Sequence, residues 1–382
     1  MDLLAALLGG AAIAVPLALV GGLVAWVIHV QKKREQAWGR VAARMGLSHA
    51  TGQIWGQLDG QSVQLRIEQR GSGKNRQSWT VAACFLQPPV DLGLAVHGQG
   101  FLSSTLGALF GAQDVPVGDP AFDAAFVVKG DEPVRVAALL REDLRRYLLR
   151  LHADRAGIHL YDAGGHLEQR GSVADERWVE WALRAVATVG RLSNEARASV
   201  PVAGPLAPHR AAWLEYARAA GLSGMDTPLC VWGRMEGASV AAYAIRSGPS
   251  QYRLEVLVRF DASLGMGLLV RPTRTLDGIA SLFGGQDHAL GDAAFDPQFV
   301  VKAPRADRLS QILDADVRRR ILDLASRGAA VQIRDDGVTV RAAAFPSEPT
   351  DVPRLVAEAK GVARAVQLGA KRPDAGAPVP YR

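Results

Sequence analysis

Four aspartates stand in a motif that the chain carries twice. The first copy reads Gly118-Asp-Pro-Ala-Phe-Asp-Ala-Ala-Phe-Val-Val-Lys129, and the second, 173 positions later, reads Gly291-Asp-Ala-Ala-Phe-Asp-Pro-Gln-Phe-Val-Val-Lys302. The four carboxylates are those of Asp119, Asp123, Asp292 and Asp296. Paired carboxylates that face each other across a pseudo-twofold axis could share a proton or hold a cation. A hydrolase with its site between the two repeats could use such a pair.

A structural interpretation accounts for the same motif. Gly118 permits a turn, Asp119 caps a short helix, and Pro120 takes the favoured first helical position. Phe122 then anchors the turn in the core. Because no base, nucleophile or metal ligand shares the spacing of the motif, we predict that the aspartates are structural.

The other chemically capable residues form no recognisable constellation. Seven histidines lack a counterpart at the matching position of the other copy, and we expect them not to cluster: His49, His97, His152, His159, His166, His209 and His288. The segment Gly71-Ser-Gly-Lys-Asn lacks the spacing of a phosphate-binding loop and is expected to be a hairpin tip. Cys84 and Cys230 lie among apolar residues and predict buried thiols. We therefore predict no catalytic, cofactor-binding or metal-ligating residue.

The repeat extends well beyond the motif and sets the fold class. The segment Phe110–Gly164 aligns without a gap with Phe283–Gly337, which indicates a duplicated domain. Alternating apolar and polar residues in Ser62–Glu68 predict a half-buried antiparallel strand, which follows a hairpin turn at Asp59-Gly60. We predict an α+β protein with two homologous domains, each an antiparallel sheet with helices packed on one face.

Helix signals give the domain bounds. An amphipathic helix is predicted to close each copy, at Glu176–Leu192 after Asp175 and at Val352–Leu368 after Asp351, with each aspartate as N-cap. Asp143 and Asp316 are predicted to cap an earlier helix. The predicted organisation is a membrane helix at 1–30, a first repeat at 31–192, a Pro-containing linker at 193–208, a second repeat at 209–370 and a disordered tail at 371–382.

The N-terminal segment has the pattern of a membrane span. No charged residue occurs from Leu3 to Ile28, a run long enough to cross a bilayer as a helix. The cluster Lys32-Lys33-Arg34 follows it, as expected on the cytoplasmic side. Trp38, Val41 and Met45 recur at helical spacing, so the span is predicted to continue into the first domain. We expect an inner-membrane protein with its N-terminus outside and both domains in the cytoplasm.

Composition limits the partners. The 382 residues carry a net charge of +6, and 48% are hydrophobic, which is ample for real cores. The basic residues are spread along the chain and are not interleaved with aromatic residues, so we expect no nucleic-acid partner. The expected partners are the lipid bilayer, through residues 3–30, and either a protein or anionic lipid headgroups.

The repeated motif, together with the N-terminal membrane helix, resembles bacterial single-pass membrane proteins that carry a domain of unknown function. The resemblance covers both repeats and also rests on the hairpin phrases Trp55-Gly-Gln-Leu-Asp-Gly60 and Trp232-Gly-Arg-Met-Glu-Gly237. It implies no activity and transfers no site residue. We therefore expect a membrane-tethered binding or scaffold protein, with a membrane-anchored hydrolase as the alternative.

Overall fold

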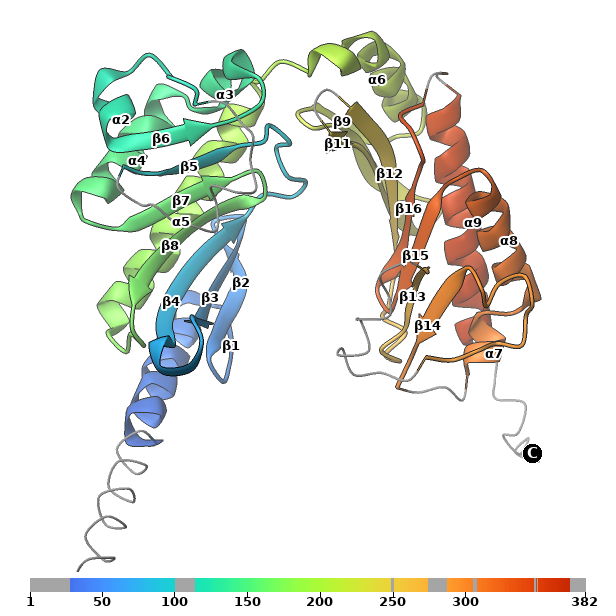
Figure 1. Ribbon diagram of the computed structural model, residues 1–382, viewed down its shortest axis with the longest axis horizontal. Coiled ribbons are helices and arrows are strands. Elements are labelled where there is room, and N and C mark those ends of the chain that lie inside the picture. The colour runs from blue at the N-terminus through green and yellow to red at the C-terminus, as the bar shows by residue number, and fades with distance from the viewer. Residues whose placement is uncertain are drawn as a thin grey trace, which may run out of the picture. The chain divides into compact units, whose positions relative to one another are not determined.

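The computed structural model describes residues 28–99, 114–248, 251–273, 287–304, 308–346, 348 and 350–371, and it divides the chain into two compact units between Val200 and Pro201 (Figure 1). Each unit is an antiparallel eight-stranded sheet with helices. The two units have the same topology, so the predicted α+β class and the pair of similar domains are confirmed.

The first unit is built on a sheet with the strand order β1-β2-β3-β4-β8-β7-β5-β6. Its strands are β1 (Ser48–Ala50), β2 (Gln53–Leu58), β3 (Gln61–Arg70), β4 (Gln77–Phe85), β5 (Ala95–Gly98), β6 (Phe126–Lys129), β7 (Gly157–Tyr161) and β8 (Gly164–Arg170). Asp59 and Gly60 join β2 to β3 with positive φ angles of 51° and 76°, which confirms the predicted hairpin turn.

Helices cover one face of this sheet. They are an N-terminal helix described over 28–45, α2 (Pro120–Ala125), α3 (Pro133–Leu139), α4 (Glu142–Ala153) and α5 (Glu176–Arg197), with a short 3-10 turn, η1 (Gly73–Asn75), at the β3–β4 tip. Alternate residues of β3, such as Val63 and Leu65, are buried on the helix side. The opposite face of the sheet carries polar side chains, and these are the ones available for chemistry.

The second unit repeats this plan in the order β14-β13-β15-β16-β12-β11-β10-β9. Its strands are β9 (Ser223–Asp226), β10 (Leu229–Met235), β11 (Ala238–Gly248), β12 (Gln251–Arg259), β13 (Leu269–Pro272), β14 (Phe299–Lys302), β15 (Ala330–Arg334) and β16 (Gly337–Arg341). Its helices are η2 (Gly204–His209), α6 (Arg210–Ala219), α7 (Leu309–Ile312), α8 (Ala315–Ser326) and α9 (Asp351–Lys371). Figure 1 shows α8 and α9 on one face of this sheet.

The connection between the units is shorter than predicted. The linker was expected at 193–208, but α5 continues to Arg197 and buries Ser193 and Ala196 in the first core. Ala203 and Leu206, at the other end of the expected linker, belong to the core of the second unit. Pro201 lies at the boundary between the units, whereas Pro205 and Pro208 lie in the 3-10 turn η2 of the second unit. Composition alone does not separate these two roles.

Two of the predicted helix caps are wrong in the same way. Asp143 is the second residue of α4, whose N-cap is Arg141. In the second copy the cap is Asp314, whose carboxylate accepts hydrogen bonds from the N–H groups of Asp316 and Val317. The predicted residues lie in the first turn of each helix, where an acidic side chain also interacts favourably with the helix dipole.

The two closing helices differ at their starts. Asp175 caps α5 as predicted, because its carboxylate accepts the N–H of Arg177 at 2.9 Å. Asp351 does not cap α9; it is the first helical residue, and its carboxylate accepts the N–H of Glu348 at 3.3 Å. Sequence pattern places helix starts to within a few residues only.

Within the described residues, no helix combines the length and the apolar character needed to cross a membrane. The predicted span at 1–30 lies outside the described residues except for its last three positions, which are helical. The predicted tail at 371–382 also lies outside them, apart from Lys371 at the end of α9.

We predict that the second unit folds alone when expressed as residues 201–371. It has its own hydrophobic core, and that core includes Ala203 and Leu206, so the fragment has to begin at Pro201. Thermal unfolding followed by circular dichroism should give one cooperative transition. A broad, non-cooperative melt would mean that the unit depends on the first one for its stability.

Candidate functional sites

The repeated motif forms the same small structure in both units. Asp119 caps α2 by accepting the N–H of Phe122 at 3.2 Å, and its second oxygen pairs with Arg145 at 3.1 Å. Asp292 likewise accepts the N–H of Phe295 at 3.2 Å and pairs with Arg318 at 2.7 Å. The predicted capping bond is therefore present twice, at the start of α2 in the first unit and of a turn at 293–298 in the second. Each aspartate also pairs with an arginine of a later helix, α4 or α8.

The second aspartate of each motif closes the turn before the cap. Asp123 accepts the N–H groups of Val117 and Gly118 at 3.0 and 3.2 Å. Asp296 accepts those of Leu290 and Asp292 at 3.1 Å each. All four carboxylates thus bind backbone N–H groups of their own unit, which supports the structural interpretation of the motif.

The electrostatics of the caps point the same way. The hydrogen bond from Phe122 N–H, followed by Arg145, lowers the pKa of Asp119. The hydrogen bond from Arg318 is the main cause that lowers the pKa of Asp292. A carboxyl that shares a proton with a second carboxylate has a raised pKa. These two carboxyls are shifted in the opposite direction.

A polar cluster that the sequence analysis did not predict lies on the open face of the first sheet. His159 on β7 stands directly opposite His166 on β8, and their stacked rings have centroids 4.8 Å apart. Glu168, two positions further along β8, places its carboxylate oxygens 3.8 Å from His159 Nε2 and 3.7 Å from His166 Nε2. The expectation that the histidines do not cluster is therefore wrong.

Burial and a salt bridge define the chemistry of this cluster. The side chains of His159 and Glu168 are each 3% exposed, whereas that of His166 is 24% exposed. Arg70 on β3 reaches across and pairs with Glu168 at 2.8 Å. Burial alone would raise the pKa of Glu168, but its interactions with His159 and Arg70 lower the pKa overall. The carboxylate is therefore ionised although it is buried.

The same environment keeps His166 neutral. Burial, followed by repulsion from His159, lowers the pKa of His166 to about 4. Burial also lowers the pKa of His97, which pairs with His159 across β5 and β7. Neutral imidazoles beside an ionised carboxylate can accept protons or bind a cation.

The sequence did contain a signal for this cluster. A two-residue hairpin loop at Asp162-Ala163 pairs Tyr161 with Gly164, and therefore pairs His159 with His166. A comparison of each histidine with the other copy of the repeat does not show this pairing, because it follows from the register of the hairpin within one copy.

The second unit keeps the location but changes the residues. Gln332, Thr339 and Arg341 stand where the first unit has His159, His166 and Glu168. The buried carboxylate there is Glu255 on β12, which pairs with Arg341 and also accepts a hydrogen bond from Tyr243. A buried carboxylate–arginine pair is thus common to both sheets, whereas the histidines belong to the first.

Each sheet also has a hollow at the same end of this polar face. In the first unit it measures about 400 Å³ and is lined by Gly98, His152, Gly157 and His159 among others. In the second it measures about 410 Å³ and is bordered by Arg271, Ala330, Gln332, Thr339 and Arg341. The first hollow is lined by His152, Arg155 and His159, and the second has Arg271 and Arg341 but no histidine among the described residues of its lining.

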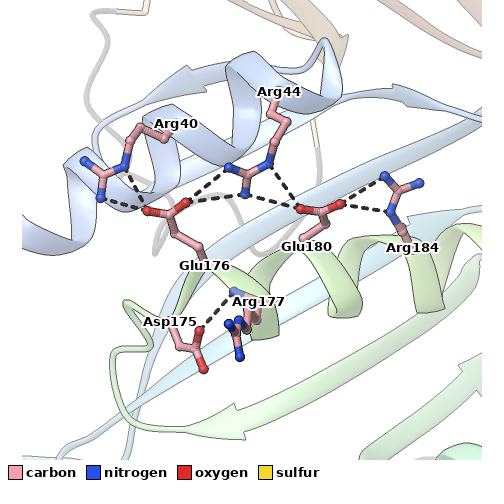
Figure 2. A network of polar contacts seen from close by, with 7 residues as sticks. All are labelled: Arg40, Arg44, Asp175, Glu176, Arg177, Glu180 and Arg184. Carbon is pink, nitrogen blue, oxygen red and sulfur yellow. Dashed lines mark hydrogen bonds and ion pairs between the residues drawn. The ribbon is translucent and has the colours of Figure 1, made fainter.

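A ladder of ion pairs fixes the N-terminal helix to α5. Figure 2 shows Glu176 between Arg40 and Arg44, and Glu180 between Arg44 and Arg184. The four N–O distances are 2.8, 3.3, 3.2 and 3.0 Å. The hydrogen bond from Arg40 is the main cause that lowers the pKa of Glu176. Single exposed pairs contribute little, but a ladder of shared partners restricts how the two helices can move.

Comparison with known proteins gives no functional assignment. No family model matches the chain, and no curated protein matches it. A crystal structure of the mycobacterial trehalose monomycolate transport factor A, TtfA, is similar at 14% identity and a TM-score of 0.29, over 47% of this chain and all of that one. A likeness at that score carries no argument about this protein.

Proposed function

We propose that the protein is a membrane-tethered binding module whose first unit lies against anionic lipid headgroups on the cytoplasmic face of the inner membrane. The predicted membrane segment, residues 3–30, would anchor it. The observation that carries the proposal is that the helix at 28–45, which includes the last three residues of the predicted segment and follows it in sequence, packs into the core of the first unit.

The N-terminal helix is held by packing as well as by charge. Trp38 is fully buried, and its indole N–H donates to the carbonyl oxygen of Val173 at 2.9 Å. Val41 and Ala42, one turn further on, are buried in the same core. Together with the ladder of ion pairs in Figure 2, this packing holds the part of the helix from Trp38 to Arg44 against the first unit. A membrane helix continuous with it would therefore fix how the first unit faces the lipid.

The end of the first unit from which this helix emerges is basic. Figure 1 shows the β3–β4 turn at the same end as the start of the N-terminal helix. The exposed basic residues there are Lys32, Lys33, Arg76, Arg170 and Arg177. Each Lys or Arg close to an anionic leaflet contributes about 1 kcal/mol of binding free energy. Five such residues would hold the unit against the headgroups even without a second anchor.

A hollow at this end offers a place for one headgroup. It measures about 530 Å³ and lies between the N-terminal helix and the start of α5. Its basic lining residues are Lys33, Arg40, Arg44 and Arg177. Glu176 forms ion pairs with Arg40 and Arg44, so a phosphate would compete with that carboxylate for the two arginines.

We predict an N-out, C-in topology, since Lys32, Lys33 and Arg34 follow the predicted span directly. A fluorescent protein fused after Arg382 should fluoresce, and alkaline phosphatase fused there should be inactive in intact cells. Active phosphatase at the C-terminus would overturn the proposed orientation. Recovery of the full chain in the soluble fraction after carbonate washing would overturn the tether itself.

A further inference from the structure

The β7–β8 hairpin places three metal-binding side chains together on the open face of the first sheet. His159 and His166 are cross-strand partners, and Glu168 follows on the same face because side chains alternate along a strand. One ligand atom from each of the three lies within 4.8 Å of the others. The backbone of a short hairpin holds all three residues in place. Binding of an ion would therefore cost little conformational entropy.

The distances are close to those of a zinc site. With bonds of about 2.0–2.2 Å, two ligands of a tetrahedral zinc ion lie about 3.3 Å apart. The two Nε2–carboxylate distances here are 3.8 and 3.7 Å. The first distance ends on Oε1 and the second on Oε2, and all three ligand atoms lie within 4.8 Å of one another. Side-chain rotations that bring these atoms together by about 1.5 Å or less would complete the site without any change in the hairpin backbone.

The surroundings orient the carboxylate as a ligand needs. Arg70 binds Glu168 Oε2 at 2.8 Å, which leaves Oε1 facing His159. Ligating carboxylates are usually held by such an outer partner. Arg70 also pairs with Glu68 at 2.9 Å, so its positive charge is balanced by a second carboxylate and does not simply repel a cation.

We propose that His159, His166 and Glu168 form a binding site for a divalent ion of the zinc class, with its fourth coordination position open. Two imidazoles and one carboxylate favour zinc and its first-row neighbours over calcium and magnesium, which prefer oxygen ligands. His166 is the partly exposed member, and His159 also borders the hollow of about 400 Å³. Solvent or a small ligand can therefore reach the fourth position.

The second unit supplies a built-in control. Its equivalent residues, Gln332, Thr339 and Arg341, include no histidine, and Arg341 brings a positive charge to the place of Glu168. The proposal therefore requires one ion per chain, bound by the first unit.

The test uses the full chain, purified in detergent without a histidine tag and stripped with a chelator. Titration with Co²⁺ should give the visible absorption of a four-coordinate ion that saturates at one equivalent, and Zn²⁺ should displace it. His166→Phe and Glu168→Gln should each weaken binding more than about 100-fold, beyond the usual effect of losing an outer partner. Thr339→Val, at the position equivalent to His166, should bind as the unchanged chain does.

The proposal fails if the unchanged chain gives no four-coordinate Co²⁺ spectrum, or if His166→Phe retains it. Glu168 is deeply buried, so Glu168→Gln could unfold the hairpin. His166 is partly exposed, so His166→Phe should remain folded, which circular dichroism can check. Loss of binding in this folded variant would then reflect the lost ligand. A second measurement is amide exchange of β7 and β8, which Zn²⁺ should slow in the unchanged chain and leave unaltered in His166→Phe.

Discussion

Replacing Phe122 with alanine should destabilise the first unit by about 3–5 kcal/mol, and Phe295→Ala should do the same to the second. Both side chains are fully buried, and each stacks on the next phenylalanine of its motif at a centroid distance of 4.8 Å. Removing either ring leaves a cavity in the core next to the capped turn, and the motif loses its most fully buried side chain. Amide exchange resolved by peptide should show faster exchange in the strands of the altered unit alone.

The aspartate variants separate this structural account from a catalytic one. Asp119→Asn and Asp292→Asn should destabilise their units, and less than the phenylalanine variants do. Each carboxylate has a lowered pKa because the fold favours its charged form. If the aspartates formed a site of repelling charges, the asparagine variants would be neutral or more stable. A more stable variant would contradict the structural role and favour the hydrolase alternative.

Acidification from pH 7 to pH 4 should cost the metal-free first unit about 3 kcal/mol through His166. Its pKa is about 4 in the folded protein, against about 6.5 when unfolded. The unfolded chain therefore binds the proton first as the pH falls. The stabilisation is complete above pH 6.5 and is lost progressively down to pH 4. Unfolding free energies from amide exchange of β8, measured with chelator present, should show this loss.

The groups that face His166 shift its pKa in opposite directions, and burial is the largest cause of the net lowering. His159 repels its protonated form, as Arg70 does, while Glu168 and Glu68 favour that form. Glu168 and Glu68 themselves have lowered pKa values. The stability that their ionised forms contribute is therefore lost only as the pH falls below about 4.3.

His166→Phe should remove most of the pH dependence between pH 7 and pH 4.5, leaving a smaller part from His97, whose pKa is also lowered. The β16 strand has Thr339 at the equivalent position and is the internal control, so its exchange should lack this component. An unchanged slope in His166→Phe would contradict the assignment.

Sequence patterns with a local cause were read correctly. Asp59-Gly60 makes its hairpin because the two residues tolerate positive φ, and Asp119-Pro120 starts α2 because the aspartate caps and the proline fits the first turn. The duplicated register gave the equivalence of the two units, since a repeat that conserves spacing conserves topology.

Features that depend on contacts across the sheet were missed. Glu168 is buried beside Arg70, which is 98 positions away in the sequence and two strands distant in the sheet. In the second unit the buried carboxylate moves to Glu255 on the neighbouring strand, so the repeat register could not show that the two pairs correspond. The end of α5 was also missed, since Ser193 looks like a linker residue until the core that buries it is known.

The proposal that the basic end of the first unit lies on lipid is tested most directly by a depth measurement. Ser72→Cys, at the tip between β3 and β4, and Val134→Cys, on α3 at the other end of the unit, would each carry one fluorophore (Figure 1). The native Cys84 and Cys230 are buried, and burial raises the pKa of Cys84 to about 11, so they should not react.

In vesicles rich in anionic lipid, a quencher attached to the headgroups should quench the label at position 72 strongly and the label at 134 weakly. The difference should shrink in neutral vesicles and in high salt, because the attraction is between charges. Equal quenching at the two positions in anionic vesicles would contradict the account, and a protein partner for the basic end would then replace the lipid.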